Sequence, residues 1–330
     1  MKSTSRRELL KMTAAGSLLS AFAPTAVFAQ GPQWPDKPVS LLVGYPPGGL
    51  TDAGARFVSR GMATALGQPV LVENKPGASG NIAAGEVQRS GSPYRLLVAN
   101  TSFTINPHTY STPSPVPTEF TPIGLILESQ LVLCVNPQAP AKNFQEFVTW
   151  VKAESGKGFS YASSGSGGNT HLAMEYFRQR TGLPKMSQVP YKGSAPAIQD
   201  VVGNQLPCMM DAASLLIPFI TSGRLRPILV TGNTRLPALP DVPTATELGI
   251  KDFVVTVFVG LWGPPKMPAD AVAKANAAMN AALADPAVAS QIVKNGDMVG
   301  GGGAERLATL TNDNYKLWGE VARRNNVKAE

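Results

Sequence analysis

The sequence predicts an α/β protein with two Rossmann-like lobes that are joined by a hinge and have a ligand cleft between them. Short runs of Val, Ile and Leu alternate with helical patterns, which is typical of parallel sheets covered by helices. This βα cycle occurs twice and is followed by a return segment, which indicates two lobes. Two Gly/Ser-rich loops, 46–52 and 163–170, each follow an apolar strand-like run and open a helix.

The first cycle covers the residues before 136. Its predicted strands lie at 39–43, 70–73 and 95–99, and its predicted helices at 52–66 and 80–87. Apolar residues recur at helical spacing from Ala55 to Leu66, and Gly67 ends the helix. A proline-rich loop over 107–122 then leads to a long apolar segment, 123–135, suited to crossing between the lobes.

The second cycle has the same organisation. Its predicted strands lie at 159–162, 188–191, 207–211 and 226–231, and its predicted helices at 144–152, 170–180, 195–202 and 215–222. After 254–262 the chain returns and ends in helices at 269–283 and 304–324. We therefore expect lobe 1 to comprise 30–128 and 253–330, and lobe 2 to comprise 129–252.

The first 29 residues have the pattern of an export signal. SRRELLK at 5–11 resembles a twin-arginine motif, an Ala-rich apolar stretch follows, and VFA at 27–29 offers a cleavage site. The order of these features favours a twin-arginine-type signal peptide over a buried helix, so we expect a periplasmic protein. No later segment has the roughly 18 uninterrupted apolar residues of a membrane span.

Charge and composition narrow the possible partners. Four of the 29 basic and one of the 22 acidic residues lie in the leader, so the mature chain has a net charge of about +4. These charges are scattered without a run of one sign, and nucleic-acid binding is not indicated.

For the oligomeric state, we expect a monomer.

Metal ions and cofactors are not indicated either. The only histidines are His108 and His171, and no CxxC is present, so the sequence predicts no metal site. Cys134 and Cys208 are either a disulfide or two separate thiols. No Walker A pattern appears, and Thr170 stands where a dinucleotide fingerprint needs glycine, so no cofactor is expected.

The two Gly/Ser-rich loops predict anion sites. A helix N-terminus presents unpaired N–H groups and a positive dipole end, and glycine lets a ligand approach the backbone closely. Two such helix starts on separate lobes suggest that both lobes close on one carboxylate. Asp52 is then either an N-cap or a ligand contact.

Several motifs in order resemble one family. They are WPDKP at 34–38, PPGG at 46–49, ENKPGASGN at 73–81, INP at 105–107, VPYKG at 189–193, LPDVPT at 239–244 and GLWG at 260–263. In these motifs the chain resembles the Bordetella uptake gene (Bug) family of periplasmic binding proteins, the receptor component of tripartite tricarboxylate transporters. The resemblance covers nearly the whole mature chain.

The resemblance implies a type II periplasmic binding fold, a small carboxylate ligand and membrane permease subunits as partners. The ligand-binding candidates are Tyr45, Gly48, Gly49, Asp52, Ser79, Asn81, Ser102, Phe103, Ser166, Gly167, Gly168, Asn169, Thr170, His171, Tyr191 and Asp211. Di- and tricarboxylates are expected, and Tyr45 with Phe103 would also flank an aromatic carboxylate.

Two other functions compete with transport. A sensory binding protein would use the same lobe closure, and sequence does not separate it from a transport receptor. A secreted hydrolase would use a serine among Ser163, Ser164 and Ser166, but no G-x-S-x-G pattern is present. We therefore expect no catalytic residue.

Overall fold

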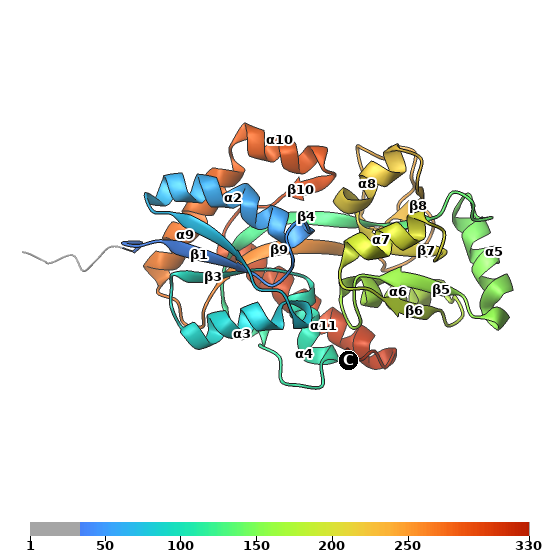
Figure 1. Cartoon of the computed structure of the whole chain (residues 1–330), viewed down its shortest axis with the longest axis horizontal. Coiled ribbons are helices and arrows are strands. Elements are labelled where there is room, and N and C mark those ends of the chain that lie inside the picture. The colour runs from blue at the N-terminus through green and yellow to red at the C-terminus, as the bar shows by residue number, and fades with distance from the viewer. Residues whose placement is uncertain (1–33, 330) are drawn as a thin grey trace, which may run out of the picture. The chain divides into compact units, whose positions relative to one another are not determined.

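A sheet of ten strands, covered by helices, forms the framework of residues 34–329, which a computed structural model describes (Figure 1). The strand order is β2-β1-β3-β9-β4-β7-β5-β6, with β8 and β10 also paired to β4. The signal peptide predicted at 1–29 lies outside the described residues. Within them, no helix has the length and apolar character needed to cross a bilayer.

The central strand β4 (Thr121–Val135) is shared by two segments of this sheet. Its residues from Thr121 to Gln130 pair with β9 (Thr256–Gly263), whereas those from Leu131 onward pair with β7 (Cys208–Ala212) and β8 (Arg226–Val230). Most of β4 is buried because helices cover both faces of the sheet.

In the first segment three parallel strands lie beside β9. They are β1 (Val39–Val43), β2 (Val70–Asn74) and β3 (Arg95–Asn100). Helix α2 (Leu50–Leu66) covers one face and shares a core with Leu41, while α3 (Asn81–Ser90) covers the other and shares a core with Leu42. Neighbouring leucines serve opposite faces because side chains alternate along a strand.

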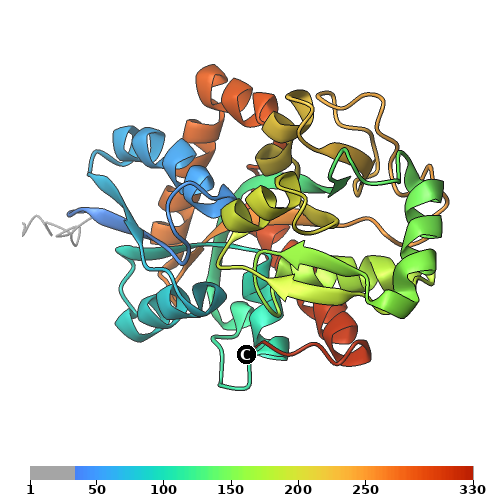
Figure 2. The same ribbon diagram turned by 45° about the vertical axis from the view of Figure 1, so that its right-hand side comes forward.

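The second segment repeats this plan with β5 (Ser160–Ser163), β6 (Ser187–Pro190) and β7 in parallel. Helices α5 (Phe144–Glu154) and α6 (Asn169–Thr181) contribute to the core on one face. Helices α7 (Ser194–Val202) and α8 (Ala213–Thr221) cover the other. Each of α6, α7 and α8 begins where a strand ends, so three helix N-termini lie at the carboxyl edge of this segment (Figure 2).

After β9 the chain returns to the first segment. Its elements there are α9 (Ala269–Leu283), α10 (Pro286–Lys294), β10 (Asp297–Val299) and α11 (Ala304–Arg324). Helix α9 packs on α2, and α11 packs on β4 and also contacts α6. The sequence predicted neither α10 nor β10. Strand β10 has only three residues, and the start signal of α10, Asp285 followed by Pro286, was missed. Asp285 caps this helix by accepting the Ala287 N–H at 2.8 Å.

One predicted loop is partly helical. The proline-rich loop was placed at 107–122, but α4 (Ser102–Thr109) includes Pro107 in its last turn. The prediction was wrong here because packing against α11 outweighs the poor helix propensity of this segment. Three short 3-10 helices lie at Ala78–Gly80, Pro117–Glu119 and Ser155–Lys157.

The two cysteines are free and buried thiols. Cys134 in β4 lies opposite Met209, and Val135 lies opposite Cys208. Residues directly opposite each other share a face, so the two thiols point to opposite faces of the sheet. This alternation, rather than distance along the chain, keeps them from forming a disulfide.

Candidate ligand-binding site

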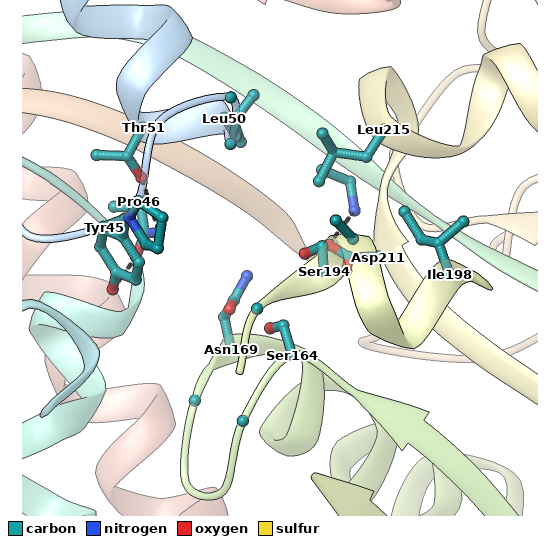
Figure 3. A pocket seen from close by; sticks show the side chains of 18 of the residues that line it. Tyr45, Pro46, Leu50, Thr51, Ser164, Asn169, Ser194, Ile198, Asp211 and Leu215 are labelled. Carbon is teal, nitrogen blue, oxygen red and sulfur yellow. Dashed lines mark hydrogen bonds between the residues drawn. The ribbon is translucent and has the colours of Figure 1, made fainter. Parts of the chain in front are cut away.

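The carboxyl edges of the two sheet segments border a cavity of about 430 Å³ (Figure 3). One side is formed by residues 45–51 together with Ser79, Asn100 and Ser102. The other side is formed by the loops that precede α6 and α7 and by the end of β7 with the start of α8. The cavity therefore lies among several helix N-termini.

The N-terminus of α2 supplies backbone N–H groups to the first side. Gly49 is the N-cap residue and has no capping side chain, so the N–H groups of Leu50 and Thr51 have no partner within the helix. Gly48 adopts a positive φ of 90°, which glycine accommodates without strain.

Asp52 holds this loop in place and does not line the cavity. Its carboxylate accepts the Gly48 N–H at 3.0 Å, the Asn74 amide at 2.9 Å and two bonds from the Arg56 guanidinium at 2.9 and 3.0 Å. Burial alone would raise the pKa of Asp52, but these hydrogen bonds outweigh it and the pKa is lowered. Asp52 is therefore a charged brace for the turn.

The N-terminus of α6 is braced in the same way. The Gly167 N–H donates to Nδ1 of His171 at 3.0 Å, four residues further on, as Gly48 does to Asp52. Burial lowers the pKa of His171, which keeps the ring neutral and able to accept this bond. Thr170 accepts the Ser164 N–H at 2.9 Å and fixes the start of the same loop.

A third helix start, that of α7, also reaches the cavity. Gly193 is its N-cap residue, and Lys192, Gly193 and Ser194 all line the wall. The sequence predicted a helix at 195–202, directly after the family motif VPYKG, but this helix start was not interpreted as an anion site. The Lys-Gly-Ser sequence after a strand was the signal that was available.

A network of polar side chains orders the first side of the cavity. The Tyr45 hydroxyl lies 2.8 Å from the Ser79 carbonyl and 3.1 Å from Asn100 Oδ1. The Asn100 amide donates to Thr51 Oγ1 at 3.0 Å, and Asn100 Oδ1 accepts the Ser102 N–H at 2.9 Å. Burial raises the pKa of Tyr45, so its hydroxyl stays protonated. The sequence analysis missed Asn100, which directly follows the strand predicted at 95–99 and is the last residue of β3.

Two side-chain contacts connect the sheet segments beside the cavity. Ser102 Oγ lies 3.3 Å from Asn169 Oδ1, and Thr109 Oγ1 donates to the Gly167 carbonyl at 3.3 Å. Both pairs join α4 to the loop that opens α6. The two sides of the cavity are therefore in direct contact at this point.

The second side of the cavity is apolar around one carboxylate. Ile198, Leu215 and Phe219 line it together with Asp211, which is 3% exposed. Burial raises the pKa of Asp211 to about 6, although the nearby Ser194 hydroxyl and the Ala212 N–H oppose the rise. Asp211 Oδ1 accepts that N–H at 2.8 Å, while no hydrogen bond within residues 34–329 reaches Oδ2.

The structure places eight of the predicted site residues in the cavity wall. They are Tyr45, Gly48, Gly49, Ser79, Ser102, Gly168, Asn169 and Asp211. The others lie outside it: Asp52, Asn81, Phe103, Ser166, Gly167, Thr170, His171 and Tyr191.

Several residues outside the wall have identifiable structural contacts. Phe103 packs edge-on against Phe120 and Trp262, with ring centroids 5.1 and 5.4 Å away. Asn81 accepts a hydrogen bond from the Asn106 amide at 2.8 Å. Tyr191 donates its hydroxyl to Asp200 on α7.

Within residues 34–329, neither histidine forms a hydrogen bond with Ser163, Ser164 or Ser166. His171 Nδ1 accepts a backbone N–H, and the His108 ring lies 4.3 Å from that of Tyr315, away from the serines. Ser163 Oγ contacts the Gln188 amide and the Gly165 carbonyl. In the same part of the chain, His, Cys, Asp and Glu residues form no group suited to a metal ion.

Helix N-termini from two α/β segments, facing one cavity beside a shared strand, define a two-lobed solute-binding receptor of the periplasmic binding protein type. The model of the tripartite tricarboxylate transporter family receptor matches residues 54–327. The chain belongs to this family, and the resemblance to Bug proteins is confirmed.

Solved structures of several periplasmic binding proteins are similar to this chain. Periplasmic binding protein BugD is 32% identical, with a TM-score of 0.81, covering 90% of this chain and 100% of BugD. MatC (Rpa3494) from Rhodopseudomonas palustris with bound malate is 29% identical, with a TM-score of 0.80, covering 87% of this chain and 99% of that one. R. palustris Rpa4515 with adipate is 27% identical, with a TM-score of 0.82 over 89% and 99%. They confirm the predicted fold class.

Proposed function

We propose that the protein is a periplasmic receptor that captures a small carboxylate between two lobes and delivers it to the permease subunits of a tripartite tricarboxylate transporter. The observation that carries the proposal is the cavity where the N-termini of α2 and α6 meet. MatC and Rpa4515, which hold malate and adipate, support a carboxylate as the ligand. The receptor acts as a monomer without catalysis.

Backbone N–H groups are suited to hold such a ligand. Each helix N-terminus stabilises an anion by about 0.3–1 kcal/mol when exposed, and by more in a partly buried site. Three of these termini reach one cavity, and the braces at Asp52 and His171 keep two of the loops in a fixed conformation. The site is therefore ordered before the ligand arrives, which reduces the entropy lost on binding.

The proposed lobe 1 comprises 30–128 and 253–330, and the proposed lobe 2 comprises 129–252. The chain passes between the lobes twice, and the proposed hinge lies where these two connecting segments contact each other. There Thr231 Oγ1 accepts the Leu131 N–H at 2.9 Å and donates to the Val255 carbonyl. The backbone N–H of Thr231 donates to the Leu131 carbonyl at 3.0 Å, and that of Val255 to the Thr231 carbonyl at 3.1 Å. Rotation about these few residues would open and close the cleft.

A thermal-shift screen of small carboxylates on the purified protein tests the ligand class. A ligand present at 100 times its Kd should raise the free energy of unfolding by about 2.7 kcal/mol. If no carboxylate stabilises the protein or binds in calorimetry, the proposed function is wrong.

A matched pair of glycine variants tests the site itself. A Cβ at Gly49 has open space around it, and Gly49 has an ordinary φ of −87°, so Gly49→Leu should fold and fill part of the cavity. Gly156→Leu is the control because its Cβ also meets no atom within 4 Å and Gly156 does not line the cavity. We expect Gly49→Leu alone to weaken binding; equal affinity in both variants would place the site elsewhere.

A further inference from the structure

The cavity has two chemically different ends. Tyr45, Pro46 and Thr51 lie on one side in Figure 3, whereas Asp211, Ile198 and Leu215 lie on the other. Both sides present helix N-termini, that of α2 on the first side and those of α6 and α7 on the second, but only the second side also has apolar surface around a carboxylate. A ligand that spans the cavity therefore meets N–H donors along its length and the acceptor Asp211 at one end.

The carboxylate of Asp211 has an unused oxygen. Its Oδ1 accepts the Ala212 N–H, but Oδ2 has no hydrogen-bond partner in the described part of the chain. A buried acceptor without a partner is costly, and more so when it is charged. The Ser194 hydroxyl lies nearby, yet it forms no hydrogen bond of ordinary geometry with this oxygen.

No positive side chain among residues 34–329 forms an ion pair with Asp211. Lys192 lines the same cavity but is exposed and lies beyond ion-pair distance of this carboxylate. The other titratable group that Asp211 influences is the Cys134 thiol on the adjacent strand β4, and burial raises the pKa of that thiol, so it is neutral. Among residues 34–329, Asp211 therefore has hydrogen-bonding neighbours on one oxygen but no side-chain cation as a partner.

We propose that Asp211 Oδ2 accepts a hydrogen bond from an ammonium or amide N–H of the ligand. This oxygen is closed to solvent in the described conformation, and a rotation of the adjacent Ser194 side chain would expose it to the cavity. The receptor then prefers carboxylates that carry an N–H donor at their far end over dicarboxylates. This inference rests on the proposed carboxylate-binding function and narrows its ligand class. The apolar side chains of Ile198, Leu215 and Phe219 would contact the methylene groups between the two ends of the ligand.

A dicarboxylate meets the opposite situation at this end. Its second carboxylate would face Asp211 in a site shielded from water, where two like charges repel strongly. Binding would then require a proton on one of the two groups. Because burial raises the pKa of Asp211 to about 6, that proton is mostly absent at neutral pH.

Isosteric ligand sets provide the test. Calorimetry at pH 7.5 compares succinate, succinamate and 4-aminobutanoate, and then adipate, adipamate and 6-aminohexanoate, on the wild-type protein. We expect the amide or the amine of the better-fitting set to bind at least about tenfold more tightly than its diacid. Asp211→Asn should abolish this preference because its amide donates where the carboxylate accepted.

Asp297→Asn is the matched control. Asp297 is also buried, at 5% exposed, burial raises its pKa to about 6, and Oδ1 has no hydrogen-bond partner in residues 34–329, yet it does not line the cavity. The same charge removal at that position should leave the ratio of amide to diacid affinity unchanged. A ratio that collapses equally in both variants would overturn the assignment to Asp211.

The pH dependence of the wild type keeps the test independent of whether Asp211→Asn folds. From pH 7.5 to pH 5 the affinity for the diacid should rise relative to that for the amine, because a proton on Asp211 or on the second carboxyl of the diacid removes the repulsion between them. The ratio cancels effects common to both ligands, such as protonation of His171. Diacids that bind as tightly as their amides, with a ratio independent of pH, refute the inference but leave the proposed function intact; a protein that binds no carboxylate refutes both.

Discussion

Replacing Asp211 with asparagine should change how the stability of the ligand-free protein depends on pH. Burial raises the pKa of this carboxyl from its ordinary 3.8 to about 6. Between these values the folded chain keeps a proton that the unfolded chain has lost, so the free energy of unfolding falls as pH rises. This loss of stability is complete well above pH 6 and absent well below pH 3.8.

The size of this effect follows from the same two values. Each pKa unit of difference between the folded and unfolded chain corresponds to about 1.4 kcal/mol. The raised pKa of Asp211 thus lowers the free energy of unfolding by about 3 kcal/mol at pH 7 and by about 0.5 kcal/mol at pH 4. Asparagine carries no charge at either pH, so any cost of its extra N–H is the same at both. The stability of the variant relative to wild type should grow by about 2 kcal/mol from pH 4 to pH 7.

Urea unfolding of the ligand-free protein, followed by circular dichroism at both pH values, measures this difference. It corresponds to about 4 °C in Tm for a chain of this size. Asp297→Asn should show a similar pH dependence, because burial raises the pKa of Asp297 to about 6 as well, but it should not alter ligand preference. Stability differences that are equal at pH 4 and pH 7 for Asp211→Asn would refute the reasoning.

Three further variants test the braces and the hinge. Arg56→Gln should leave the charge of Asp52 without its partner and weaken carboxylate binding about two- to fivefold at low salt, with less effect at high salt, as calorimetry would show. His171→Leu should remove the acceptor of the Gly167 N–H and lower stability by about 1–3 kcal/mol in urea unfolding, together with ligand affinity. Thr231→Val should lower stability by a similar amount, and small-angle scattering should show a smaller change on ligand addition. Unchanged stability in the last two variants, or unchanged affinity in the first, would contradict these roles.

Local sequence patterns predicted the fold because each strand and helix depends mainly on nearby residues. The strand at 39–43 has the predicted bounds, and α2 begins two residues before the predicted 52. The same reasoning failed at α4, where Ser102–Thr109 is helical through contact with α11, more than 190 residues away in the chain. Contacts between distant segments are not visible in a local pattern.

The site was harder to predict because a residue in a loop can face either the cavity or the rest of the protein. Gly167 was expected to contact the ligand, but a Cβ there would lie 2.7 Å from that of Ala329 and 3.0 Å from that of Thr109. Glycine at this position therefore allows the close approach of Ala329 and Thr109. Phe103 likewise packs in the core instead of lining the cavity. Sequence identified the loops, while the direction of each residue depends on tertiary packing.

The two braces also explain how an acidic residue can stand beside an anion site. Asp52 lies next to the N-terminus of α2, where an uncompensated charge would repel a carboxylate. Its charge is instead matched by Arg56, and its oxygens are occupied by the Gly48 N–H and the Asn74 amide. At α6 the corresponding brace, His171, is neutral. The two braced loops therefore add no net charge beside the cavity, and Asp211 is the acidic side chain among the residues that line it.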